Sequence, residues 1–320
     1  MPRRPPAADP ARAIFFGSGA FAVPVLDALA AAPEVTLVAV VTAVPRPAGR
    51  SAAVTPTPVG ERAARLGLPI LTPDRLRNPA FATQLAALRP ELGILADYGK
   101  LLPPAILGLF GRGILNLHPS LLPRHRGATP IPAAIVDHDA ETGVTLFRMD
   151  AGMDTGPVVA SETIALPDDA DAPSLESRLA VVGAGLLART LGPWIDGTLP
   201  AVAQPEDGAN VTRPLRREDG RLDATRPAAA LERQVRALRP WPGTFVEAAG
   251  GRIVVLRVAV APSQAGDEPG RLIDEGAGGM ALATADGRLQ LLEVQPAGGR
   301  AMDGGALLRG RPGLAGTRVG

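Results

Sequence analysis

An amide and an imidazole occur two residues apart in the segment GILNLHPSLLPRHRGATP, which runs from Gly113 to Pro130. The segment begins as an apolar β-strand, in which alternate side chains point to the same face. Asn116 and His118 therefore share a face and lie about 7 Å apart along the strand. An amide can donate hydrogen bonds, and an imidazole can exchange a proton near neutral pH. Together they indicate a catalytic site more strongly than a lone buried histidine would.

A carboxylate would complete such a site, and the later segment RMDAGMDTGP offers Asp150 and Asp154. Glycines at positions 152 and 156 indicate a loop after the next strand. A carboxylate in this loop could reach His118, fix the tautomer of its ring and raise its pKa. The residues alone favour neither acid, and an ordinary aspartate in a turn is an equally good interpretation of each.

Composition excludes several other kinds of site. The chain has 320 residues and no cysteine, so thiolate nucleophiles, disulfides and cysteine-bound zinc are ruled out. Its three histidines, His118, His125 and His138, form no HExxH motif, and we expect no metal. The only lysine is Lys100, so arginine should make any phosphate contact. The net charge of +1 does not by itself indicate a nucleic-acid partner.

The sequence offers no sign of secretion or of membrane insertion. Residues 1–12, MPRRPPAADPAR, lack the apolar core of a signal sequence, and we expect a disordered tail there. No run of about 18 apolar residues occurs, so no membrane span is predicted. We therefore expect a soluble, cytoplasmic protein.

Strands alternate with helices in the first two thirds of the chain. We expect strands at 13–16, 35–42, 69–72, 91–99, 113–118 and 142–150, and helices at 21–31, 59–67, 75–88, 128–139 and 172–197. This alternation predicts an α/β fold with a doubly wound, mostly parallel, Rossmann-like sheet. In such sheets ligands bind at the carboxyl ends of the strands, which is where Asn116 and His118 lie.

The pattern changes near residue 205. A polar segment rich in proline and glycine, LPAVAQPEDGANVT, reads as a linker, and one helix at 227–239 follows it. Several short β-like runs then come with glycine-containing turns between them, which is typical of a small β-barrel. We expect a catalytic domain at 13–204 and a second domain at 205–320.

The glycines of GSGAFA, residues 17–22, match the start of a dinucleotide-binding motif. That motif needs an acidic residue at the end of the second strand to bind a ribose. The second strand here ends in VTAVPRP, without Asp or Glu. We therefore interpret the glycines as a tight strand-to-helix turn.

Several segments together resemble a known enzyme family. NLHPSLLPRHRGATP and ETGVTLFRMDAGMDTGP strongly resemble the corresponding segments of the 10-formyltetrahydrofolate-dependent formyltransferases. RPAGR, GLPIL, RALRPWPGTF and QPAGGRAM extend the resemblance over residues 13–305. The arginine loop and the C-terminal part are most similar to the members that formylate methionyl initiator tRNA.

The resemblance implies a catalytic set of Asn116, His118 and Asp154, and it favours Asp154 over Asp150. In this family a formyl group moves from N10 of 10-formyltetrahydrofolate to an amine, and no metal is required. We expect Asn116 to donate to the carbonyl oxygen as charge collects there, as can His118 if it is protonated. We expect His118, or a water held by Asp154, to carry the proton.

The resemblance also implies where the two substrates bind. The folate co-substrate is expected to contact Ser120, Leu121, Leu122, Pro123 and Tyr98. Asp97 departs from the family, in which an apolar residue precedes Tyr-Gly. Initiator methionyl-tRNA is expected to contact Arg46, Arg50, Arg216 and Arg217, with an OB-like C-terminal barrel lying along it. The family usually carries lysines after the second arginine of the loop, but SAA stands there in this chain, which predicts weaker phosphate attraction.

Two alternatives remain open from the sequence. The same chemistry could act on an aminosugar nucleotide, or the chain could be a folate- or RNA-binding module without catalysis. Retention of all three catalytic residues argues against the second. We expect a monomer, as is usual in the family.

Overall fold

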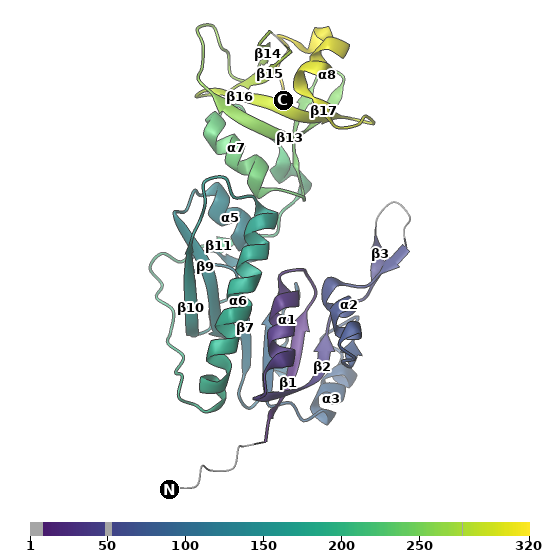
Figure 1. Ribbon diagram of the computed structural model, residues 1–320, viewed down its shortest axis with the longest axis vertical. Coiled ribbons are helices and arrows are strands. Elements are labelled where there is room, and N and C mark those ends of the chain that lie inside the picture. Colours follow the sequence, from purple (N-terminus) through teal and green to yellow (C-terminus); the bar gives the residue numbers. More distant parts are fainter. Residues whose placement is uncertain (1–8, 49–52, 277) are drawn as a thin grey trace. The chain divides into compact units, whose positions relative to one another are not determined.

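A seven-stranded sheet is formed by β1 (Ala11–Gly17), β2 (Val35–Val41), β5 (Ile70–Leu71), β6 (Leu92–Ala96), β7 (Ile114–His118), β9 (Glu141–Arg148) and β10 (Val158–Ala165). Its strand order is β10–β9–β7–β6–β1–β2–β5, and Figure 1 labels β10, β9, β7, β1 and β2 of this sheet. Strands β5, β2, β1, β6 and β7 are parallel, whereas β9 is antiparallel to β7 and β10 to β9. The predicted doubly wound, mostly parallel sheet is confirmed.

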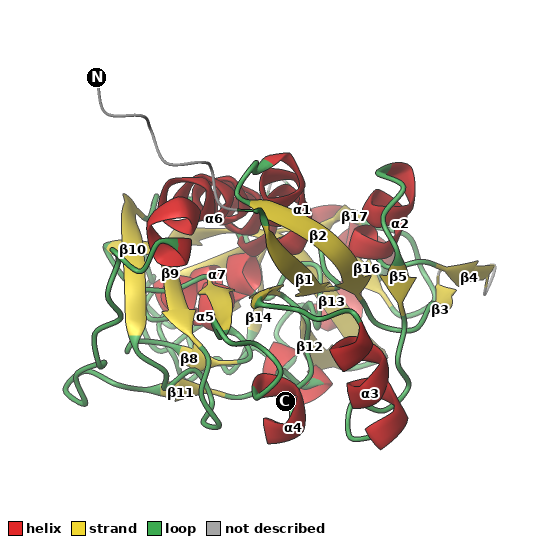
Figure 2. Cartoon of the chain, turned by 90° about the horizontal axis from the view of Figure 1, so that it is seen from below, coloured by secondary structure: helices red, strands yellow, loops and turns green. Residues whose placement is uncertain are grey.

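Helices cover both faces of this sheet (Figure 2). On one face lie α1 (Ala22–Ala31) and α6 (Ala172–Ile195), and on the other lie α3 (Pro79–Ala87) and α4 (Pro104–Leu107). Phe81 of α3 and Ile106 of α4 belong to one apolar cluster with Ile114 of β7. Because alternate residues of a strand share a face, Asn116 and His118 point to the same side of the sheet as Ile114.

Side-chain caps and prolines determine where two helices begin. The Thr57 hydroxyl accepts the N–H of Gly60 (2.9 Å), directly before α2 (Pro58–Arg65). Asn78 plays the same part for α3, where its side-chain oxygen accepts the N–H of Ala80 (3.0 Å). Each helix has proline in its first turn, where a missing N–H costs nothing. The helix expected from residue 75 therefore begins at Pro79.

The C-terminal part forms one antiparallel, six-stranded sheet. Its strands are β12 (Thr244–Ala248), β13 (Gly251–Ala261), β14 (Leu272–Asp274), β15 (Met280–Ala283), β16 (Arg288–Pro296) and β17 (Met302–Asp303). The order is β12–β13–β16–β15–β14, and β17 pairs with β16. Leucines and valines of the sheet pack with α7 (Ala228–Ala237) and α8 (Gly304–Gly310) in one core. The small β-domain expected after the α/β part is thus present.

The computed structural model describes residues 9–48, 53–276 and 278–320. Two units can be distinguished, the first made of residues 1–130, 141–165 and 176–212 and the second of residues 131–140, 166–175 and 213–320. Most of the expected tail, residues 1–12, lies outside the described residues. Its last part is ordered, because β1 already begins at Ala11.

The turn after β1 is closed by the neighbouring strand β6. The backbone N–H groups of Ser18 and Gly19 both donate to the carbonyl oxygen of Asp97, at 2.9 and 3.2 Å. A Cβ atom at Gly19 would lie only 1.6 Å from the Asp97 carboxylate, so a larger residue there would displace that side chain. Since these amides already have a partner, they are not available to a phosphate. This agrees with a tight turn and not with a dinucleotide site.

The Asp97 carboxyl group is crowded by the turn after β1, although the residue as a whole is exposed. It lies against Gly19, and within the described part of the chain no donor hydrogen-bonds to it. Burial of the carboxyl, with a smaller contribution from the negative charge of Glu176, raises the pKa of Asp97 to about 6. Its backbone is also in the left-handed region, with φ of 44°. A carboxylate without a partner in such a place destabilises the folded state when ionised.

We predict that Asp97→Asn stabilises the protein in a pH-dependent way. A pKa raised from 3.8 to about 6 means that ionisation opposes folding. The cost is fully present above pH 6 and disappears as the pH falls toward the unfolded-state pKa. The melting temperature of the variant should exceed that of the parent at about pH 8 and converge with it near about pH 4. Asp74→Asn, at an exposed position, serves as the control, and a constant offset for Asp97→Asn at both pH values would contradict the assignment.

Candidate active site

Strand β7 places Asn116 and His118 in the middle of the large sheet. All five of its residues are buried, and the exposed fractions of Asn116 and His118 are only 7% and 5%. Asn116 lies opposite Leu95 of β6, and His118 opposite Thr145 of β9. The expectation that both side chains share one face at the carboxyl end of a buried strand is met.

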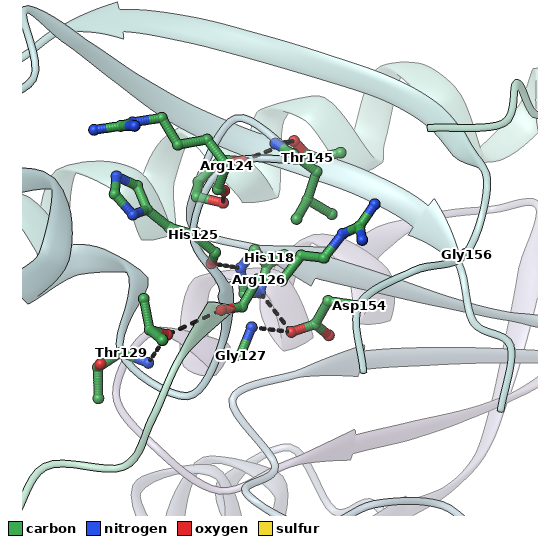
Figure 3. A network of polar contacts seen from close by, with 12 residues as sticks. His118, Arg124, His125, Arg126, Gly127, Thr129, Thr145, Asp154 and Gly156 are labelled. Carbon is green, nitrogen blue, oxygen red and sulfur yellow. Dashed lines mark hydrogen bonds and ion pairs between the residues drawn. The ribbon is translucent and has the colours of Figure 1, made fainter. Parts of the chain in front are cut away.

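The ring of His118 is held by a backbone carbonyl and faces a carboxylate (Figure 3). Its Nε2 lies 2.8 Å from the carbonyl oxygen of His125, which can only accept, so Nε2 carries a proton. The opposite nitrogen, Nδ1, lies 3.7 Å from Oδ2 of Asp154. The tautomer is therefore determined by His125, whereas the sequence had suggested the acid.

Burial determines the charge of His118. Loss of hydration lowers its pKa, and this outweighs the opposing effects of the Asp154 carboxylate and the His125 carbonyl, which raise it. The prediction that the carboxylate would raise the pKa is correct for that single interaction but wrong for the net effect. In the structure as it stands, His118 is a neutral imidazole at neutral pH.

The structure separates the two acids of the RMDAGMDTGP loop. Asp154 lies beside His118, and its Oδ2 accepts the backbone N–H of Gly127 (2.7 Å). Asp150 instead closes its own loop, because its Oδ1 accepts from the N–H of Gly152 (2.9 Å) and the hydroxyl of Thr155 (2.8 Å). The position of Asp154 thus suits catalysis, and that of Asp150 suits a turn.

The amide of Asn116 has no hydrogen-bond partner within the described part of the chain. Only 7% of Asn116 is exposed, yet its amide atoms are not among the described polar atoms that are both fully buried and unpaired. Here the amide lies two strand positions from the imidazole, on the same face. It is therefore free to donate to a bound substrate.

The residues of the loop after β7 that are expected to contact folate differ in how far they are buried. Ser120 is fully buried, and its hydroxyl donates to the carbonyl of Arg124 (2.7 Å). Thr145 fastens the same loop, since its hydroxyl donates to the Ser120 carbonyl (2.7 Å) and accepts the N–H of Leu122 (3.1 Å). Leu121, Leu122 and Pro123 remain partly exposed. These three can line a ligand site, whereas Ser120 shapes the loop.

Tyr98 packs into the core on the α3 and α4 side of the sheet. Its ring meets that of Phe16 edge to face, with the centroids 5.9 Å apart. Burial raises the pKa of Tyr98 to about 12, and its hydroxyl has no partner among the described residues. The ring is part of the core next to Asp97. The hydroxyl is the one polar group of this side chain that could contact a ligand.

The arginines expected to contact tRNA lie at the surface where they are described. Arg46 is exposed in β3 (Arg46–Ala48), which pairs with β4 (Ala53–Thr55), and Arg50 lies outside the described residues. Arg216 and Arg217 are exposed in the second unit. Among the described residues, no cluster of three or more His, Asp or Glu side chains could hold a metal ion. No helix in the described ranges is long and apolar enough to cross a membrane.

Sequence reasoning missed the segment from Gln204 to Thr212, which was interpreted as part of a linker. Its end forms β11 (Val211–Thr212) and pairs with β8 (Arg126–Gly127), directly after His125. Gln204 hydrogen-bonds to Arg126 and to the backbone of Asp154. Only the pairing of the strands brings this segment to the site, and no local motif announces it.

Two family models match the chain. A formyl transferase model matches residues 11–191, and a model of the formyl transferase C-terminal domain matches residues 214–312. Proteins called methionyl-tRNA formyltransferase are similar over nearly the whole length. That of Roseiflexus sp. is 43% identical over 97% of this chain and 96% of its own, and that of Thermus thermophilus is 43% identical over 97% and 99%.

Solved structures share the fold at low identity. An N-formyltransferase from Helicobacter canadensis, in complex with folinic acid and dTDP-3-aminofucose, is 14% identical with a TM-score of 0.64, over 88% of this chain and 98% of its own. HypX from Aquifex aeolicus in complex with tetrahydrofolic acid is 17% identical with a TM-score of 0.59. The match to HypX covers 94% of this chain but only 47% of HypX. From the matching family models and the relatives of similar length, the chain belongs to the formyl transferase family.

Proposed function

We propose that this protein transfers a formyl group from 10-formyltetrahydrofolate to the α-amine of methionine carried on initiator tRNA. The proposal is supported by the place of Asp154 beside His118, with Asn116 on the same strand face, in a chain 43% identical to methionyl-tRNA formyltransferases. The expected compartment is the cytoplasm, and the expected functional unit is the monomer.

Apolar side chains around the catalytic pair support a ring-bearing co-substrate. Leu121 to Pro123 follow His118 closely in sequence and are partly exposed. Leu101, in the loop after β6, is 69% exposed, and Met153, next to Asp154, is 45% exposed. Large apolar side chains left exposed on loops are suited to cover a flat ligand.

The state of His118 defines its part in the reaction. Because Nε2–H is bound to the His125 carbonyl, Nδ1 is the atom that can accept a proton. The attacking amine forms a bond to the formyl carbon, the bond from that carbon to N10 breaks, and one proton passes from the amine to N10. Nδ1 takes this proton, and Asp154 at 3.7 Å stabilises the imidazolium until N10 receives it.

Asn116 is the donor for the developing oxyanion. Its amide has no partner in the described part of the chain, and a neutral His118 has no second N–H to offer. An amide already in place donates to the oxygen without further reorganisation as charge develops there. Of the two donors expected from the sequence, the geometry therefore favours Asn116.

The acceptor is tested by competition. We expect formyl transfer from 10-formyltetrahydrofolate to methionyl-tRNA and none to a dTDP-linked aminosugar when both are present. The aminosugar is the alternative because an enzyme of the same fold was solved with such a nucleotide. Formylation of the sugar alone would reject the proposed acceptor but keep the chemistry.

We predict that His118→Ala and Asp154→Asn each lower formylation by about two to four orders of magnitude. The first removes the proton acceptor, and the second removes the charge that stabilises it. Single-turnover rates measure the effect, and thermal melts establish that the fold is kept. His138→Ala is the control, because the side chain of that histidine is 62% exposed and lies in the second unit. Turnover close to the parent in either test variant would remove that residue from catalysis.

We predict that the double variant Arg46→Ala/Arg50→Ala raises KM for methionyl-tRNA and leaves KM for 10-formyltetrahydrofolate unchanged. Each arginine that meets a phosphate releases counterions, so the salt dependence of tRNA binding should become shallower. Steady-state kinetics at several salt concentrations provides the measurement. Arg75→Ala removes an exposed arginine outside this loop and should change neither value. An unaltered KM and salt slope in the double variant would exclude the loop from tRNA recognition.

A further inference from the structure

Gln204 connects two loops that hold the catalytic groups. Its Nε2 donates to the backbone carbonyls of Asp154 (2.8 Å) and Gly156 (2.7 Å). Its Oε1 accepts from Nη2 (2.8 Å) and Nε (3.0 Å) of Arg126. The amide is thus saturated, with both protons and the oxygen in use.

These partners leave only one orientation for the amide. The two carbonyls can only accept and the guanidinium can only donate, so the nitrogen must face the Asp154 loop and the oxygen must face Arg126. The Arg126 side chain is buried, and the Gln204 amide oxygen accepts hydrogen bonds from two of its N–H groups. A group that lacked either a donor or an acceptor could not fill this place.

Arg126 lies between the two residues that position the catalytic pair. On one side the His125 carbonyl accepts Nε2–H of His118, and on the other the Gly127 N–H donates to Asp154. Gln204 therefore ties the loop that orients the imidazole to the loop that carries the carboxylate. At 3.7 Å the imidazole and carboxylate are too far apart for a direct hydrogen bond. Their separation is set by how the two loops are joined.

The far end of the same segment is anchored independently. The backbone N–H of His125 donates to the side-chain oxygen of Asn210, and the N–H of Arg126 donates to the Asn210 carbonyl (3.0 Å). The Thr212 hydroxyl donates to the Arg126 carbonyl (3.0 Å). Gly127 is required at this pairing, because a Cβ atom there would lie 2.2 Å from the Thr212 carbonyl oxygen. The segment is thus bound to the 125–127 loop whether or not Gln204 is present.

We propose that Gln204 is a positioning residue of the formyl-transfer site, which sets the separation of His118 and Asp154 by clamping the Asp154 loop to Arg126. For its effect on turnover, this inference rests on the proposed function. The clamp acts by holding the pair in place, since the donors and the acceptor of the Gln204 amide are already used within the protein. A displacement of about 1 Å in such a pair can cost about a hundredfold in rate.

The competing explanation is that Gln204 only provides a partner for the buried guanidinium of Arg126. Two variants separate the explanations. Gln204→Glu keeps, and strengthens, the acceptor for Arg126 but has no N–H for the carbonyls of Asp154 and Gly156. Gln204→Ala removes both sets of hydrogen bonds. If the clamp matters, both variants should lose catalytic rate. If Arg126 only needs an acceptor, the glutamate supplies it, and Gln204→Glu should keep the parent rate.

Kinetics of the two variants give the first test. We expect kcat for methionyl-tRNA to fall about ten- to hundredfold in both, with KM for methionyl-tRNA unchanged, because only the catalytic groups move. Gln295 offers matched controls, since it is also half-buried and its Nε2 also donates to a backbone carbonyl, that of Gly299 (2.9 Å) in the second unit. Gln295→Ala and Gln295→Glu should keep the parent kcat. A parent-like kcat in Gln204→Glu, or in both Gln204 variants, would overturn the proposal.

A second test does not depend on the acceptor or on turnover. The chain has three histidines, so ¹⁵N-labelled imidazole signals can be assigned and titrated by NMR. Burial lowers the pKa of His118, the Asp154 carboxylate and the His125 carbonyl raise it, and the charge of the His125 ring lowers it. Release of the Asp154 loop should therefore lower the pKa of His118 in Gln204→Ala, which adds no charge near the ring. An unchanged His118 titration would overturn the proposal. If the parent itself fails to formylate methionyl-tRNA, the proposed function falls, and this titration still decides the part of Gln204.

Discussion

The hydrogen bond from Nε2–H of His118 to the His125 carbonyl is the interaction on which the rest of the site depends. It fixes the ring tautomer and leaves Nδ1 as the basic atom, turned toward Asp154. To offer that carbonyl, the chain after β7 must turn back toward the strand, and His125 adopts φ of 59°. The same turn brings the Gly127 N–H to the Asp154 carboxylate. One backbone path thus orients both members of the pair.

Burial and charge act on His118 in opposite directions. A neutral, buried imidazole is a good proton acceptor only if the imidazolium that forms is stabilised, and Asp154 provides this without a direct hydrogen bond. The arrangement stores strain in the loops around it. Of five described non-glycine residues with positive φ, Asp97, His125 and Asp154 lie in the loops after β6, β7 and β9. Such conformations persist where the surrounding contacts over-determine them.

The segment from Gln204 to Thr212 gives the site a third support, far from the other two in sequence. Its backbone pairs with the loop after β7, and its first residue holds the loop after β9. The chain then continues from Thr212 into the C-terminal unit. The catalytic geometry therefore depends on residues that follow the α/β fold in sequence, which explains why a boundary placed by composition near 205 cuts through this support.

The sheet, the shared face of Asn116 and His118, and the family could be predicted from the sequence, because apolar alternation, strand periodicity and a dense local motif involve neighbouring residues. The residues alone did not distinguish Asp150 from Asp154, and the resemblance to the family favoured Asp154. Three properties became visible only in the folded chain: His125 fixes the tautomer, burial lowers the pKa of His118, and Gln204 joins the two loops. These properties arise from desolvation and from hydrogen bonds between residues up to 78 positions apart, for which local sequence carries no signal.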